Sequence, residues 1–158
     1  MKQSPASQQQ QAVLFACGLN SVRSPMAAAL LKQMLGGGGR ALYISSAGVR
    51  KGELDPFAAA AMEEVGIDIK SHRPITFEEL EDLEGLNYDL IVTLSPEAHH
   101  KALELTRTSA VDVEYWPTAD PTAIEGSREQ RMNAYREVRD QLIRRLRARF
   151  ALRAPGNE

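Results

Sequence analysis

The segment CGLNSVRSP, residues 17–25, contains the only cysteine of the chain, and an arginine follows it after five intervening residues. A run of backbone N–H groups in front of a helix forms a concave donor site for a tetrahedral anion. Arg23 adds a planar fork that bonds two oxygens of such an anion. The same positive groups favour the thiolate form of Cys17, and a thiolate beneath a bound phosphate is an in-line nucleophile. The spacing therefore predicts a nucleophile inside an anion-binding loop.

The residues around Cys17 fit such a loop. Glycine and asparagine, at positions 18 and 20, tolerate the positive φ that a tight loop demands, and the hydroxyl of Ser24 is placed to donate to the sulfur. A cysteine at a strand end can also be a small buried hydrophobe, but the strand before the loop and the Ser-Pro helix start after it favour the nucleophile. The expected phosphate-binding residues are Gly18, Leu19, Asn20, Ser21, Val22 and Arg23.

A second candidate for chemistry is Asp120, which precedes Pro121. An Asp-Pro pair often opens a helix, but the next predicted helix begins near Ser127, so this carboxylate has no long helix to cap. Breaking a phosphate ester needs an acid at the departing oxygen and then a base for water, and one carboxyl can serve both steps. We expect Asp120 to face Cys17 as the general acid and base.

The other polar residues predict no metal or nucleic-acid site. His72, His99 and His100 lack metal-ligand spacing with a carboxylate or thiol, so we expect structural or surface roles. The basic run RRLRAR, at 144–149, complements the dipole of a helix C-terminus and is interpreted as a solvated helix end. The net charge of -2 gives no general attraction to nucleic acid or to a membrane surface.

Composition indicates one soluble α/β domain. The 158 residues are 43% hydrophobic and 25% charged, enough for one core. A lone cysteine excludes an internal disulfide and a four-cysteine metal site. Because the N-terminal residues MKQSPASQQQQ are polar and no run of about 18 apolar residues follows, we expect a cytoplasmic protein. The domain is predicted over 12–150, between a disordered tail at 1–11 and a frayed end at 151–158.

Predicted strands and helices alternate along the chain. Short apolar or β-branched runs predict strands at residues 12–16, 41–45, 88–94 and 110–116. An N-cap residue followed by proline predicts three helix starts, at Ser24-Pro25 (ending at Gly36), Asp55-Pro56 (ending at Gly66) and Ser95-Pro96. A last helix is predicted over 127–150, with a Ser127–Gln130 capping box, and GGGG at 36–39 as a turn. Such alternation implies a parallel sheet covered by helices on both faces, with ligands at the carboxyl ends of the strands.

With these motifs in order, the chain resembles the low-molecular-weight protein tyrosine phosphatases, whose relatives include thioredoxin-coupled arsenate reductases. The resemblance rests on Cys17–Pro25, SSAG at 45–48, GIDIKSHRP at 66–74, DLIVTL at 89–94 and Asp120-Pro121. It implies a single-domain, three-layer α/β/α fold of Rossmann-like or flavodoxin-like type with a four-stranded parallel sheet. It also implies that Cys17 forms a phosphocysteine, that Arg23 and the loop amides bind phosphate, that Ser24 supports the thiolate and that Asp120 is the general acid.

The sequence departs from the family pattern at several positions. The loop usually reads Cys-x-Gly-Asn, whereas here glycine comes second and Leu19 third. Val22 stands where many phosphatases have a second cysteine, and Thr122 and Ala123 stand where the eukaryotic members have tyrosines. The segment 48–54 also lacks an aromatic residue, so specificity for phosphotyrosine has the least support.

Three functions remain open at this point. The first is a phosphomonoesterase without metal or organic cofactor, acting on phosphotyrosine in a protein or on a small aryl phosphate. The second is an arsenate reductase; because the chain has no further cysteine for a disulfide relay, it would need an external small thiol. The third is a weakly active domain that binds phosphate, or another tetrahedral oxyanion, for regulation.

Overall fold

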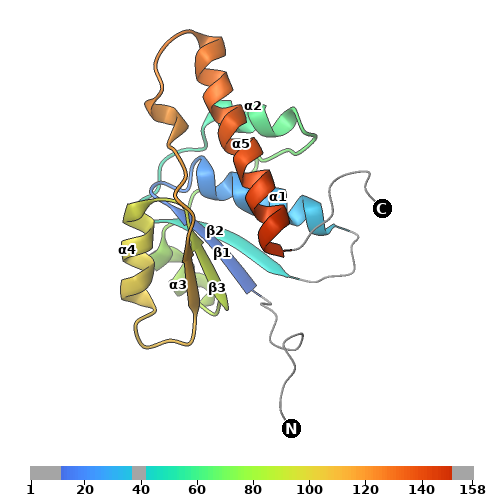
Figure 1. Ribbon diagram of the computed structural model, residues 1–158. Coiled ribbons are helices and arrows are strands. Elements are labelled where there is room, and N and C mark those ends of the chain that lie inside the picture. Colours follow the sequence, from blue (N-terminus) through green and yellow to red (C-terminus); the bar gives the residue numbers. More distant parts are fainter. Residues whose placement is uncertain (1–11, 37–41, 151–158) are drawn as a thin grey trace.

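The computed structural model describes residues 12–36 and 42–150. The predicted tails at 1–11 and 151–158, and all but the first residue of the glycine turn, lie outside the described residues. Four strands form one parallel sheet in the order β2-β1-β3-β4 (Figure 1). Their bounds are Ala12–Cys17 for β1, Tyr43–Gly48 for β2, Leu90–Thr93 for β3 and Asp112–Tyr115 for β4. The predicted parallel α/β sheet is confirmed.

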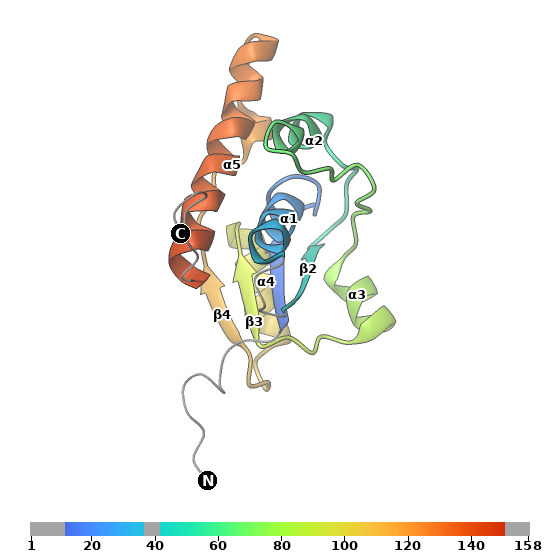
Figure 2. The ribbon, with the colours of Figure 1, turned by 90° about the vertical axis from the view of Figure 1, so that its right-hand side faces the viewer.

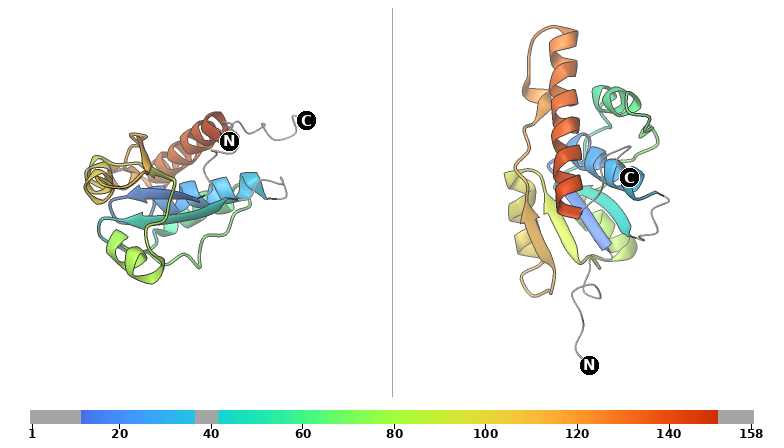
Figure 3. Two further views of the ribbon diagram at one scale, coloured as in Figure 1. Left: turned by 90° about the horizontal axis from the view of Figure 1, so that it is seen from below. Right: turned by 45° about the vertical axis from the view of Figure 1, so that its right-hand side comes forward.

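Helices cover both faces of the sheet. On one face lie α1 (Arg23–Leu35), α2 (Pro56–Glu63) and α5 (Arg128–Phe150), and on the other lie α3 (Phe77–Glu84) and α4 (Pro96–Leu105). Figures 2 and 3 show α5 and α3 on opposite sides of the strands. Alternate residues of β1 enter the two cores, Val13 and Phe15 on one side and Leu14 and Ala16 on the other. The fold is therefore the expected three-layer α/β/α domain.

Most predicted helix starts are confirmed by their capping bonds. Asp55 and Ser95 accept hydrogen bonds from main-chain N–H groups at the starts of α2 and α4. Ser127 and Gln130 exchange the two bonds of a capping box before α5. The prediction that Ser24 caps α1 is wrong, because α1 begins two residues earlier, at Arg23, and its N-cap residue is Val22.

Helix α3 is absent from the sequence-based prediction. Thr76 accepts a hydrogen bond from the main-chain N–H of Glu79, whose side chain in turn accepts from the N–H of Thr76. This Thr-x-x-Glu capping box was visible in the sequence. The helix has only eight residues and buries only Phe77 and Leu80, so its apolar periodicity is too short to stand out.

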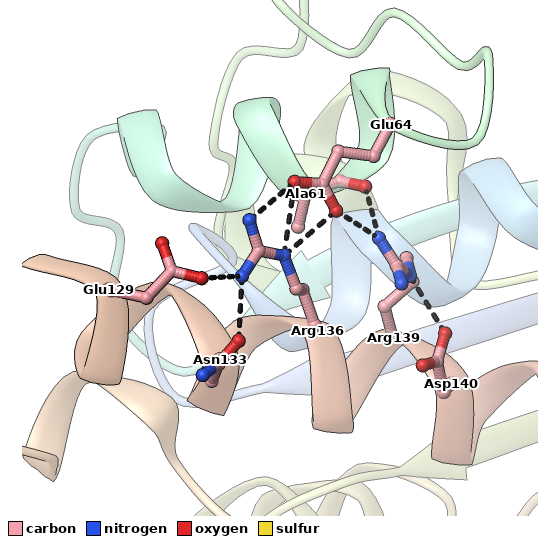
Figure 4. Close-up of polar contacts among 7 residues, drawn as sticks. All are labelled: Ala61, Glu64, Glu129, Asn133, Arg136, Arg139 and Asp140. Carbon is pink, nitrogen blue, oxygen red and sulfur yellow. Dashed lines mark hydrogen bonds and ion pairs between the residues drawn. The ribbon is translucent and has the colours of Figure 1, made fainter.

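A network of charged side chains ties α2 to α5 (Figure 4). Glu64, which follows α2, accepts hydrogen bonds from both Arg136 and Arg139 of α5. Arg139 is buried, and it also donates to the carbonyl oxygen of Ala61 at 2.9 Å. These bonds to arginine lower the pKa of Glu64 to about 2. The network fixes the end of α2 on the long C-terminal helix.

The N-terminal end of α2 is also fixed to α5. The hydroxyl of Tyr135 donates to Oδ2 of Asp55 at 2.6 Å. Further along α5, Arg149 donates to Glu114 at 2.7 Å, so one arginine of the basic run at 144–149 forms an intramolecular ion pair. No helix in the described part of the chain is long and apolar enough to cross a membrane.

Candidate active site

The loop between β1 and α1 turns its carbonyl groups outward. The carbonyl oxygens of Cys17, Gly18 and Leu19 accept hydrogen bonds from main-chain N–H groups of the segment 49–52, at 2.9 to 3.2 Å. The carbonyl of Ser21 accepts from Asp55 at 3.2 Å, and that of Asn20 contacts Nε2 of His72 at 2.9 Å. The segments that follow β2 and α2 thus hold the loop from outside.

The amide groups of the same loop are left for a ligand. In a trans peptide the N–H points away from the C=O of the preceding residue. Because the carbonyls of residues 17–21 are bonded outward, the N–H groups of residues 18–22 point the other way, and none of them donates to a protein atom within the described residues. A cavity of about 160 Å³ borders this loop. The arrangement is a nest of donors suited to a tetrahedral anion.

Asn20 holds the loop in shape. Its φ is 56°, the only positive φ of a non-glycine residue in the described ranges, and its side chain is fully buried. Gly18 does not share this conformation, so that expectation is wrong for Gly18. The Asn20 amide Nδ2 donates to Oγ of Ser24 at 2.8 Å and to Oγ of Ser46 at 2.9 Å. Its Oδ1 accepts from the main-chain N–H of Ile75 at 2.9 Å.

The sulfur of Cys17 lies 3.0 Å from the Oγ of Ser24, and both residues are buried. Oγ of Ser24 already accepts a hydrogen bond from Asn20, so its own proton is free to point at the sulfur. This contact explains why Ser24 does not cap α1: its side chain is used by the loop.

Arg23 is held by the loops that follow β3 and β4. Its Nη1 donates to the carbonyl of Thr118 at 2.9 Å and contacts that of Leu94 at 3.5 Å. Its Nη2 lies 4.0 Å from Oδ2 of Asp120. These bonds fix the guanidinium beside the cavity that Cys17 also lines.

Asp120 uses its two oxygens differently. Oδ1 accepts from the N–H and the hydroxyl of Thr122, at 3.0 and 2.7 Å, and so caps a three-residue 3-10 turn, η2, at Pro121–Ala123. Oδ2 is the atom that approaches Arg23. The carboxylate is half-exposed and lines the same cavity as Cys17. It is therefore both a local cap and a polar group facing the anion-binding loop.

A surface ion pair at the mouth of the cavity was missed by sequence reasoning. Arg50, after β2, pairs with Glu97 in the first turn of α4, and both side chains line the cavity. A Cβ at position 18 would lie 3.2 Å from Oε1 of Glu97, so glycine there leaves room for this pair. Among the described residues, no aromatic side chain lines the cavity, in agreement with the absence of pocket aromatics in the sequence.

The three histidines differ in environment. His72 is half-buried at the back of the loop, and burial lowers its pKa. His99 contacts the Thr93 hydroxyl at 3.0 Å, while His100 pairs with Glu104 on the surface of α4. In the ranges 12–36 and 42–150, no group of three His, Cys, Asp or Glu is arranged to hold a metal ion. The contact of His72 with the anion-binding loop had no signal in the spacing of the sequence.

Comparisons with known proteins agree on one family. The model of the low molecular weight phosphotyrosine protein phosphatases matches residues 12–153. A curated arsenate reductase of Bacillus subtilis is 36% identical over 136 residues, covering 85% of this chain and 91% of that protein.

Solved structures show the same family resemblance. The arginine phosphatase YwlE, as a mutant with a phosphorylated active-site serine, superposes with a TM-score of 0.70 at 26% identity, covering 86% of this chain and 91% of that one. An arsenate reductase in a phosphate-binding state gives a TM-score of 0.66 at 28% identity, covering 89% and 97%. This chain therefore belongs to the low molecular weight phosphotyrosine protein phosphatase family.

Proposed function

We propose that this protein hydrolyses phosphate monoesters through a phosphocysteine on Cys17. The observation that carries the proposal is the position of the only cysteine of the chain, 3.0 Å from the Ser24 hydroxyl and at the edge of a nest of unbonded amides. A reductase that passes a disulfide along its own chain needs further thiols, and this sequence has none. Transfer of a phosphoryl group needs only the one sulfur.

In the first step, the Cys17 thiolate attacks phosphorus opposite the ester oxygen. The S–P bond forms as the P–O bond to the leaving group breaks. Asp120, which lines the same cavity as Cys17, gives its proton to the departing oxygen, so the product leaves as a neutral alcohol or phenol. The amides of residues 18–22 and the guanidinium of Arg23 stabilise the charge on the three equatorial phosphate oxygens.

In the second step, water attacks the phosphorus of the phosphocysteine. The Asp120 carboxylate, now deprotonated, takes a proton from this water. The S–P bond breaks, inorganic phosphate leaves and Cys17 returns as a thiolate. The Ser24 hydroxyl, directed by Asn20, stabilises that leaving sulfur. The phosphorylated active-site serine in the YwlE arginine phosphatase mutant supports a covalent intermediate in this protein as well.

The substrate class we propose is a phosphorylated protein side chain or a small aryl phosphate. The cavity at Cys17 has a volume of only about 160 Å³ and is lined largely by polar residues. It therefore accommodates the phosphate itself, while the group that carries the phosphate extends past the mouth formed by Arg50 and Glu97. We propose a cytoplasmic location, where reducing conditions keep the single thiol free.

Arsenate reduction is the second candidate, supported by the 36% identity to a curated arsenate reductase. Arsenate has the same tetrahedral shape as phosphate and fits the same donors. Here two external small thiols would reduce the arsenate bound to Cys17: they are oxidised to one disulfide with each other, arsenite is released and Cys17 returns as a free thiol. The reaction then depends on an added thiol, whereas hydrolysis of a phosphate ester does not.

Initial rates measured side by side distinguish these functions. One set of assays follows release from an aryl phosphate, and the other follows oxidation of added glutathione, or another small thiol, in the presence of arsenate. We expect thiol-independent turnover of the aryl phosphate, lost in Cys17→Ser. Arsenate-dependent thiol oxidation without phosphatase turnover would establish the reductase. Phosphate binding with neither activity would indicate the regulatory binding domain.

A further inference from the structure

A second cavity lies behind the anion-binding loop, between α1, β2 and the segment 66–75. Its volume is about 530 Å³, and it shares no lining residue with the cavity at Cys17. Cavities of about 300 to 1,000 Å³ are the size that holds small organic ligands. The proposed hydrolysis does not use this cavity, and it is too large to be explained as a site for phosphate alone.

The charged residues of this cavity favour an anion. Lys32 of α1 and Arg73 both line it, and within the described part of the chain neither has a carboxylate partner. One carboxylate, Asp68, lines the cavity, and its Oδ1 accepts a hydrogen bond from the main-chain N–H of Lys70 at 2.9 Å. Two cations thus face one already bonded anion, which leaves a net positive charge for a ligand.

The remaining residues of the cavity favour a ligand in which the anionic group is attached to an apolar body. The apolar part of the lining comes from Pro25, Ala28, Ala29, Ile67, Ile69 and Ile75. Uncharged polar side chains of the lining are Gln33, Ser45, Ser46, Ser71 and His72. Apolar and polar residues thus contribute comparable parts of the lining, which suits a ligand that carries an anionic group on an apolar body.

The cavity is connected directly to the anion-binding loop through Asn20. Three of its lining residues contact Asn20: Ser46 and Ile75 bond its side chain, and His72 contacts its carbonyl at 2.9 Å. Asn20 is also the residue that orients Ser24 toward the sulfur. A ligand that restricts these three neighbours therefore restricts the loop.

We propose that this second cavity is an effector site for a small organic anion, a carboxylate or phosphate on an apolar body, and that its occupation tightens oxyanion binding at the loop. The ligand anion pairs with Lys32 and Arg73, and its body lies on the alanines of α1 and the isoleucines of 66–75. Occupation reduces the motion of the residues that hold Asn20, so the loop loses less conformational freedom when phosphate binds.

The binding test uses naphthalene-2-carboxylate as probe, measured by calorimetric titration with phosphate present to fill the loop. The measurement needs no turnover, so it is independent of what Cys17 catalyses. We expect saturable binding, weakened about tenfold or more in the double variant Lys32→Gln/Arg73→Gln, because charge-assisted bonds are lost. Lys70→Gln is the matched control; Lys70 lies in the same segment but does not line the cavity, and its variant keeps the wild-type affinity.

Two further measurements complete the test. Ala29→Leu fills part of the cavity without changing its charge and is expected to weaken binding of the probe. The melting temperature of this variant is recorded to verify that it is folded. By linkage, the probe and phosphate must change each other's affinity by the same factor, and we expect about fivefold tighter phosphate binding with the probe bound. Binding unaffected by loss of Lys32 and Arg73, or a phosphate affinity that the probe leaves unchanged, overturns the proposal.

Discussion

The main-chain N–H of Ile75 lies 2.9 Å from Oδ1 of Asn20 and thereby decides which way the Ser24 hydroxyl points. With Oδ1 accepting from Ile75, the amide Nδ2 must face Ser24 and donate to its oxygen. The proton of Ser24 is then directed to the sulfur of Cys17, 3.0 Å away. A residue 58 positions along the chain from Cys17 thus sets the hydrogen bonding around the sulfur of that cysteine.

This relationship predicts the effect of Asn20→Asp. Aspartate tolerates positive φ, so the loop conformation is retained, but a carboxylate accepts from Ser24 and turns its proton away from Cys17. Loss of a hydrogen bond to a charged group corresponds to about 1.5–3 kcal/mol, so we expect kcat to fall about 10- to 100-fold. Ser24→Ala should give a similar loss.

The control for that prediction is Ser46→Ala, which removes the other acceptor of Asn20 without touching Ser24. Its kcat should stay within a few-fold of wild type. Wild-type kcat in both Asn20→Asp and Ser24→Ala would refute the role of the hydroxyl.

The loss of activity in Asp120→Asn should depend on the leaving group of the substrate. Asparagine keeps an oxygen that accepts from Thr122, so the turn at Pro121–Ala123 remains capped. It has no proton to give, so kcat/KM for an alkyl phosphate should fall about 10²- to 10⁴-fold, while that for p-nitrophenyl phosphate falls far less. Equal losses for both substrates, with an unchanged melting temperature, would assign Asp120 to another role.

The charged network between α2 and α5 predicts a loss of stability in acid. Because the folded pKa of Glu64 is about 2, below its ordinary value of 4.5, its contribution is complete above pH 4.5 and disappears as the pH falls toward 2. The melting temperatures of wild type and Glu64→Gln should therefore differ at neutral pH and converge at low pH. Glu63→Gln is the control, since Glu63 has only a 3.9 Å contact with Lys70. A difference that stays constant with pH would contradict the assignment.

The sequence predicted the fold well because its signals are local. Proline after an N-cap residue marked the starts of α2 and α4, and three- and four-residue apolar steps marked α5, whose apolar residues are buried as expected. The same local rule failed at Ser24, where a tertiary contact with Cys17 and Asn20 takes the hydroxyl that an N-cap would use. It also missed α3, whose capping box lacks a long periodic face.

Of the candidate site, only the motif residues could be predicted from the sequence. Cys17 and Arg23 stand out by their spacing, and the structure brings Ser24 and Asp120 to them. The supports of the loop come from distant segments: His72 and Ile75 hold Asn20, and the carbonyls of Leu94 and Thr118 hold Arg23. Main-chain N–H and carbonyl groups carry no sequence signature, so these contacts could be identified only from the folded structure.

The single thiol predicts irreversible oxidation by peroxide. A thiolate is oxidised first to a sulfenic acid and then to sulfinic and sulfonic acids, and this chain has no second cysteine to trap the first product. We expect activity after peroxide to be recoverable by added thiol only at short delays, with bound phosphate protecting Cys17. Intact mass counts the added oxygens. Full recovery after long exposure, with no mass increase, would show that Cys17 is not an accessible thiolate.

The central claim, a phosphocysteine on Cys17, is tested most directly by trapping it. In Asp120→Asn the base for the second step is missing, so p-nitrophenyl phosphate should phosphorylate the enzyme faster than water releases the phosphate. The measurement is intact mass after rapid quenching, followed by fragment mapping. The account predicts one phosphoryl group per chain, on Cys17, and none in Cys17→Ala. Phosphate release with Cys17 unmodified throughout, or a phosphoryl group on another residue, would contradict it.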